Sequence, residues 1–121
     1  MAEILSERSG VLDLTLEEGT DFTLPLVWKD ENGVLIDLTG YTAALQLRPS
    51  PKDNGTPLLS VTESSGIALG GVLGTIDITI TKAQNIFGCK SMVYDLEMTS
   101  SGGTTIRLLR GSVTSLPEVT K

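Results

Sequence analysis

Asp95 and Glu97 are the side chains whose types and spacing best suit a chemical reaction. They alternate with Tyr94 and Leu96 in a strand-like stretch, so they share one face of an extended chain, about 6.6–6.8 Å apart from the rise of two strand residues. Glycoside hydrolysis needs only two carboxylates flanking one bond. Acids are, however, ordinarily exposed on protein surfaces, and a solvated strand face accounts for both residues. We therefore favour the solvated face over a catalytic pair.

Other reactive side chains are scarce. The 121 residues include no histidine and one cysteine, Cys89. The commonest general base and the commonest zinc ligand are therefore missing, and one thiol makes neither an intrachain disulfide nor a metal site alone. We expect Cys89 to be a buried, small apolar residue. The sequence predicts that the protein is not an enzyme and holds no cofactor or metal.

Oxygen-bearing side chains cluster near one expected hairpin. Asp30, Glu31, Asn32 and Asp37 lie close together in the chain and would be suitable ligands for calcium. Their spacing differs from that of an EF-hand loop. Asn32-Gly33 and aspartate are also the residues that a tight turn demands. A plain turn is the favoured interpretation, and calcium is the alternative.

The charge of the chain argues against two classes of partner. Fifteen acids against nine bases give a net charge of −6, whereas phosphate-backbone binding needs clustered Lys and Arg. Arg107 and Arg110 lie three apart in a strand-like stretch, so we expect them on opposite faces. No apolar run is long enough for a membrane-spanning helix, and the charged start of the chain is unlike a signal peptide. We expect a soluble domain that folds in a reducing cytosol, with no nucleic-acid, membrane or small-molecule partner.

The elements that must position these residues are short strands. Apolar residues make up 40% of the chain and aromatic residues only 4%, with thirteen Gly and five Pro, which suits an aliphatic core and many turns. Period-two alternation predicts strands at residues 11–16, 22–28, 34–36, 41–48, 58–63, 67–69, 72–80, 92–98 and 104–114. Thr81 would cap one helical turn that Gly88 ends. The pattern predicts an all-β fold, an immunoglobulin-like antiparallel β-sandwich of seven to nine strands with at most one short helical turn; a barrel is the alternative.

We expect one domain, with an N-terminal arm at residues 1–10, a β-sandwich at 11–115 and a C-terminal tail at 116–121. Proline and glycine concentrate at 49–57, which predicts a surface loop. Trp28 continues the alternation of the 22–28 strand and is expected in the core rather than as a sugar-stacking platform. The residues expected to determine core and turns are Trp28, Asn32, Gly33, Asp37, Gly40, Tyr94 and Leu96.

Two stretches carry a resemblance to a known group of proteins, DFTLPLVWKDENGVLIDLTGYTAALQLRPS and VYDLEMTSSGGTTIRLLRGSVTSLPEVT. Their pairing of an Asp-x-x-Gly turn with Asp-Leu-Thr-Gly resembles small bacteriophage virion proteins and the N-terminal immunoglobulin-like domain of phage baseplate upper proteins. The resemblance covers roughly residues 11–120. It is carried by Asp30, Asn32, Gly33, Asp37, Leu38, Thr39, Gly40, Arg48, Tyr94, Asp95, Leu96, Gly111, Val113 and Val119.

The resemblance implies a non-enzymatic virion structural protein, assembled in the host bacterial cytoplasm. The chain lacks the long C-terminal extension and receptor-binding head of baseplate upper proteins, which favours a connector, collar or neck, tail or decoration adaptor. Such a protein contacts other virion proteins (neck, tail, fibre or capsid) and forms a homo-oligomer in the particle. A virion-displayed adhesin or carbohydrate-binding module is the alternative. The candidate partner contacts are Ile4, Leu5, Pro49, Pro51, Pro57, Pro117 and Val119.

Overall fold

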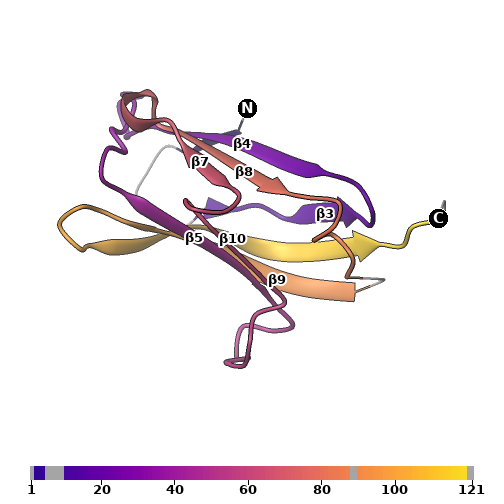
Figure 1. Ribbon diagram of the computed structural model, residues 1–121. Helices are drawn as coiled ribbons and strands as arrows, with labels where there is room; N and C mark the ends of the chain where they lie inside the picture. The colour runs from indigo at the N-terminus through magenta and orange to yellow at the C-terminus, as the bar shows by residue number, and fades with distance from the viewer. Residues whose placement is uncertain (1, 5–9, 88–89, 120–121) are drawn as a thin grey trace.

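Two β-sheets pack face to face in the computed structural model (Figure 1), which describes residues 2–4, 10–87 and 90–119. The four-stranded sheet has the order β1-β4-β8-β7, and its strands are β1 (Ala2–Ile4), β4 (Phe22–Trp28), β7 (Ile67–Leu69) and β8 (Thr75–Ile80). The six-stranded sheet has the order β2-β10-β9-β5-β6, with β3 also paired to β10. Its strands are β2 (Gly10–Val11), β3 (Leu14–Glu17), β5 (Thr42–Arg48), β6 (Leu59–Thr62), β9 (Lys90–Thr99) and β10 (Thr105–Leu116).

The strand order is that of an immunoglobulin domain. The series β4-β8-β7 and β10-β9-β5-β6 correspond to strands B-E-D and G-F-C-C′ of that fold, and these neighbours are antiparallel. Only β1, β2 and β3 pair in parallel in the described part of the chain. The predicted immunoglobulin-like β-sandwich is therefore confirmed, and two separate sheets rule out the barrel. The described residues form ten strands rather than the predicted seven to nine. The described segments include no helix long and apolar enough to cross a bilayer.

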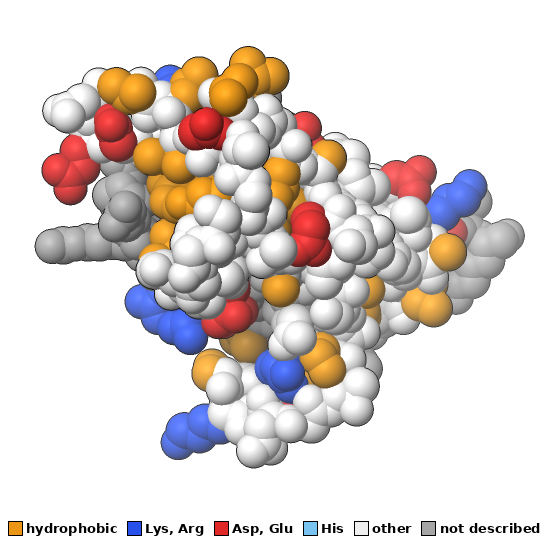
Figure 2. All heavy atoms as spheres, turned by 60° about the vertical axis from the view of Figure 1, so that its left-hand side comes forward, with side chains coloured by type: hydrophobic (Ala, Val, Ile, Leu, Met, Phe, Trp, Pro, Cys, Tyr) orange, Lys and Arg blue, Asp and Glu red, His pale blue; other side chains and the backbone are white. Residues whose placement is uncertain are grey.

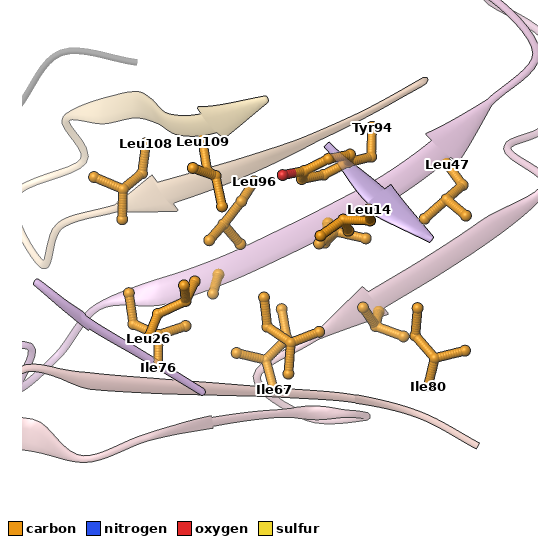
Figure 3. Close-up of a cluster of buried hydrophobic side chains, with 14 of the residues drawn as sticks. Leu14, Leu26, Leu47, Ile67, Ile76, Ile80, Tyr94, Leu96, Leu108 and Leu109 are labelled. Atoms are coloured by element: carbon orange, nitrogen blue, oxygen red, sulfur yellow. The ribbon is translucent and has the colours of Figure 1, made fainter. Parts of the chain in front are cut away.

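The inward faces of both sheets form one aliphatic core (Figure 3). Alternate residues of β8, Ile76, Ile78 and Ile80, are at most 1% exposed. They face Leu96 and other side chains of the six-stranded sheet. Fully burying one such side chain contributes about 1.5–3 kcal/mol. The period-two pattern therefore describes a real division between the core and solvent on these strands.

Trp28 lies in this core at the end of β4, only 2% exposed. Its ring meets Tyr41 edge to face, with centroids 5.9 Å apart. The indole N–H is buried without a hydrogen-bond partner among the described residues. Tyr94 and Leu96 also lie in the core, 4% and 0% exposed.

The expected hairpin after β4 is only partly formed. Residues 34–36 are not a strand; a single bridge joins Lys29 to Leu35. The N–H of Gly33 donates to the carbonyl of Asp30 at 3.0 Å, and Gly33 and Gly40 both have a φ of +82°. Backbone hydrogen bonds from Asp30 to Val34 and from Ile36 to Trp28 pair the two segments only briefly, because the side chains of Asp30 and Asp37 form turns on either side.

The one short helix among the described residues lies elsewhere than the helical turn predicted at Thr81. It is a 3₁₀ turn, η1 (Gly71–Leu73), which overlaps the first two residues of the predicted 72–80 strand. Gly74 ends it with a φ of +66°, and a Cβ at Gly74 would lie 2.8 Å from the carbonyl oxygen of Trp28. Thr81 opens only one hydrogen-bonded turn, with no helix. Gly88, its predicted end, lies outside the described residues, as does Cys89.

The two expected extensions of the sandwich are partly in its sheets. Residues 2–4 of the predicted arm form β1, and Ile4 pairs with Trp28 through the backbone; Leu5 lies outside the described residues. Leu116, predicted as the first residue of the tail, is the last residue of β10 and lies opposite Glu17. Beyond it Pro117 is exposed, and Val119 is 92% exposed.

Candidate docking surfaces

A hollow of about 620 Å³ lies on the outer face of the six-stranded sheet. It is built from outward side chains of β5, β9 and β10, and the 49–57 loop walls one end. This loop projects below β9 in the view of Figure 1. Pro51 lines the hollow, Pro49 is exposed, and Pro57 is half-buried. We call this feature the sheet hollow.

The structure brings together two arginines that the sequence analysis placed on opposite faces. The β9–β10 register shifts between Arg107, which pairs with Glu97, and Leu109, which pairs with Leu96. Such a β-bulge adds one residue to a strand and inverts the alternation beyond it. Leu108 and Leu109 are both buried as a result, while Arg107 and Arg110 both line the sheet hollow. The prediction of opposite faces was wrong because strict period two does not hold across a bulge.

Asp95 and Glu97 also line the sheet hollow. Asp95 accepts a hydrogen bond from Nε of Arg107 at 3.1 Å, and both side chains are substantially exposed. Such surface pairs contribute about 0–1 kcal/mol. Glu97 and Arg110 are exposed, and neither makes an ion pair with a described residue. The sheet hollow can therefore bind a polar or charged surface, but the described residues around it provide no nucleophile activated by an adjacent base.

Arg48 fastens the loop beside the sheet hollow. Its guanidinium donates to the carbonyl of Gly55 at 2.6 Å, and Nη1 lies 3.5 Å from Oδ2 of Asp53. A third hydrogen bond, of 3.0 Å, joins it to Oε1 of Gln46. The sequence analysis predicted a surface loop here, but nothing in the local pattern indicated this anchor.

Tyr94 lines another part of the sheet hollow and is held by a hydrogen bond. Its hydroxyl donates to the carbonyl of Leu12 at 2.6 Å, in the irregular step between β2 and β3. Burial and, secondarily, the charge of Asp13 raise the pKa of Tyr94. Asp13 in turn accepts a hydrogen bond from the N–H of Ser112 at 3.0 Å, and hydrogen bonds with Ser112 lower its pKa. This bonding positions Leu12 against Gly111, where an added Cβ would overlap the Leu12 carbonyl.

A second candidate surface lies at the end of the sandwich that is on the left in Figure 1. The connection between β4 and β5 meets the connection between β7 and β8 at this end. The N–H of Leu38 in the first donates to the carbonyl of Gly71 in the second at 2.9 Å. Four large aliphatic side chains of these connections are 42–66% exposed. Figure 2 shows hydrophobic side chains gathered at this end with acidic side chains among them. We call this set the apolar tip: Val34, Leu35, Val72 and Leu73.

The acids beside the apolar tip shape its turns. Oδ1 of Asp30 accepts the backbone N–H groups of Asn32 and Val34 at 2.8 and 3.0 Å. Oδ1 of Asp37 accepts the hydroxyl and backbone N–H of Thr39 at 2.6 and 3.0 Å, and these bonds lower the pKa of Asp37. No three acidic, histidine or cysteine side chains form a metal-binding group within the described ranges. Asp30 and Asp37 therefore accept hydrogen bonds within tight turns, as the favoured interpretation of this segment predicts.

Comparisons with known proteins identify no family for this chain. No family model matches the sequence, and the search of curated proteins found no match. Extracellular domains 3–5 of Drosophila OTK match with a TM-score of 0.42 and 15% identity over 93% of this chain, which spans 35% of that structure. Murine CRIg matches with a TM-score of 0.40 and 9% identity, over 88% of this chain and 92% of that one. With both TM-scores below 0.5, neither match carries an argument about this protein.

Proposed function

We propose that this protein is a non-enzymatic structural protein of a bacteriophage virion: a connector, collar or neck, tail or decoration adaptor that docks onto other virion proteins. The apolar tip carries the proposal, because four aliphatic side chains remain 42–66% exposed on a domain that already has a complete core. Clustered exposed apolar residues mark interaction sites. The two turns that carry the virion-protein resemblance, at Asp30–Gly33 and Asp37–Gly40, also lie beside this tip.

The size of the apolar tip suits a repeated contact. Because the four aliphatic side chains are only 42–66% exposed, burying what remains exposed would contribute about 3–7 kcal/mol, from about 1.5–3 kcal/mol for each complete burial, and association itself costs about 4–15 kcal/mol. One tip alone leaves little net affinity. Several copies held in a symmetric particle raise the effective concentration of each contact, so a homo-oligomeric assembly fits this surface.

The charge around the apolar tip specifies the partner's chemistry. Glu31 is exposed, and Asp30 and Asp37 lie in the turns that carry the tip. Two copies meeting tip to tip would place these like charges together, which opposes binding. The proposed occupant is a different virion protein with an apolar recess rimmed by Lys or Arg.

Particle incorporation tests this docking role. The double variant Val72→Ser/Leu73→Ser should fold normally, because both residues are exposed, yet be missing from purified particles. Ile86→Ser is the matched control: Ile86 is 68% exposed and lies outside the apolar tip, so this variant should be incorporated normally. Thermal unfolding of each variant checks the fold. Normal incorporation of the double variant would overturn the role of the tip.

The virion assignment has its own test. Mass spectrometry of density-purified particles from a lysed host that carries this gene should detect the chain in a fixed ratio to the capsid protein. Particles without its peptides would refute the assignment, whatever the apolar tip does. The carbohydrate-binding alternative has less support, because a sugar would need an exposed aromatic ring to stack on, and all five aromatic side chains are buried or half-buried. A positive glycan array would revive it.

A further inference from the structure

We propose that Asn54 is a site of spontaneous deamidation and that the fold protects Asn32 from the same reaction. The chain contains two acid-Asn-Gly sequences, Glu31-Asn32-Gly33 and Asp53-Asn54-Gly55. All four Asn and Gly residues are exposed. Glycine after asparagine favours the reaction because it has no side chain to block attack and its backbone moves freely. The local sequences are nearly equivalent, so a difference in rate must come from the structure.

The reaction needs only water and the chain itself. The backbone nitrogen of the glycine loses its proton to solvent and attacks Cγ of the asparagine. The new N–Cγ bond closes a five-membered succinimide while the Cγ–Nδ2 bond breaks and ammonia leaves. Water then opens the ring at either carbonyl, which produces aspartate or isoaspartate. No oxidant or reductant is consumed.

The turn at Asn32 opposes this attack. The N–H of Gly33, the attacking group, donates to the carbonyl of Asp30 at 3.0 Å. Oδ1 of Asp30 also holds the N–H groups of Asn32 and Val34 at 2.8 and 3.0 Å. The backbone on both sides of the reacting bond is therefore fixed, and the nucleophilic nitrogen is engaged. Reaction requires that the turn first open.

The loop at Asn54 lacks these restraints. Neither Asn54 nor Gly55 donates a backbone hydrogen bond to any described residue. The contact at this dipeptide is made by the Gly55 carbonyl, which accepts from Arg48 at 2.6 Å. That carbonyl belongs to the following peptide group, so the bond leaves the Gly55 nitrogen free to attack. The Asn54 side chain and the Gly55 nitrogen can therefore reach the reactive geometry without unfolding of the sandwich.

Deamidation would change the wall of the sheet hollow. Either product adds a negative charge next to Asp53, the acid that lies 3.5 Å from Arg48. Isoaspartate also lengthens the main chain by one methylene before Gly55, so the Gly55 carbonyl no longer fits its 2.6 Å contact with Arg48. Ageing of the protein should therefore loosen the 49–57 loop and make the sheet hollow more acidic.

Peptide mapping of the full-length folded protein, incubated at mildly alkaline pH, tests the proposal. Deamidation at Asn54 should be at least about tenfold faster than at Asn32, which corresponds to about 1.4 kcal/mol of turn opening. Enzymatic methylation of isoaspartate should label the 54–55 peptide. In urea the two rates should converge, because the turn is gone. Equal rates in the folded protein, or faster reaction at Asn32, would overturn the proposal.

Two variants complete the test. Asn54→Gln should abolish isoaspartate labelling of the loop, because the longer side chain closes a ring far more slowly. Asp30→Ala should accelerate the reaction at Asn32 and leave Asn54 unchanged, because Oδ1 of Asp30 holds only the Asn32 turn. An unchanged Asn32 rate in Asp30→Ala would contradict protection by the turn. None of these outcomes depends on the virion proposal.

Discussion

Replacing Tyr94 by phenylalanine removes one hydroxyl and with it the tie between β9 and the step from β2 to β3. That hydroxyl donates to the carbonyl of Leu12 at 2.6 Å, and the residue is only 4% exposed. A hydrogen bond contributes about 0.5–1.5 kcal/mol net, and a buried acceptor left without its partner costs about 1–3 kcal/mol. We expect Tyr94→Phe to lower the free energy of unfolding by about 1–2 kcal/mol.

Urea unfolding followed by tryptophan fluorescence measures this loss. With a urea dependence of about 1–3 kcal/mol per molar, the midpoint should fall by roughly 0.3–2 M while the slope stays constant. Tyr41→Phe is the matched control, because the Tyr41 hydroxyl makes no hydrogen bond with a described residue. This control should unfold like the parent.

The same variant has a signature at alkaline pH. Folding raises the pKa of Tyr94 above its ordinary value of 10.0, so the unfolded chain loses the phenolic proton first. The stability from this group is complete below that value and falls as the pH rises above it. The parent should therefore lose more stability than Tyr94→Phe as the pH rises above about 10. An unchanged urea midpoint at pH 7, or parallel alkaline losses, would refute the assigned role of the hydroxyl.

Three further substitutions examine how the fold is held. Gly111→Ala should lower the free energy of unfolding by about 1–3 kcal/mol, measured by urea titration, because its Cβ would overlap the Leu12 carbonyl. Asn85→Ala should lower the free energy of unfolding by about 1–3 kcal/mol and with it the thermal midpoint, because the buried Nδ2 donates to two turn carbonyls at 2.8 and 3.0 Å. Asp13→Asn should make urea midpoints less sensitive to acid: hydrogen bonds with Ser112 lower the pKa of Asp13 below its ordinary 3.8, so its contribution is present above that value and lost as the pH falls through the folded pKa.

Two controls separate these effects from general surface changes. Gly102→Ala should be harmless, because the nearest atom to its added Cβ is 3.8 Å away and its φ is not positive. Asn54→Ala replaces an exposed asparagine and should leave the thermal midpoint unchanged. A loss in Gly102→Ala as large as in Gly111→Ala would exclude steric overlap as the cause. An acid sensitivity unchanged in Asp13→Asn would contradict the role of the Ser112 contact.

The chain contains enough local information to predict most of the strands and turns, although residues 34–36 form no strand and residues 2–4 do. Apolar residues spaced by two, such as Ile76, Ile78 and Ile80, require one side of an extended segment to leave water. Asn32-Gly33 requires a tight turn because glycine alone adopts positive φ freely. These are short-range properties of the chain, and they were sufficient for the fold class.

Only the tertiary structure decided which residues meet on a surface. The bulge between Arg107 and Leu109 places two arginines on one face, although their spacing in a regular strand predicts two faces. The hydrogen bond from Tyr94 to Leu12 joins positions far apart in the chain. The Leu12 carbonyl lies so close to Gly111 that an added Cβ would overlap it, although the sequence around Gly111 shows no turn. The apolar tip likewise exists because residues 34–35 and 72–73 belong to connections that meet at one end. Local alternation of apolar residues predicts which side of a strand is buried. Strand pairing and packing between distant segments determine which residues lie next to that strand.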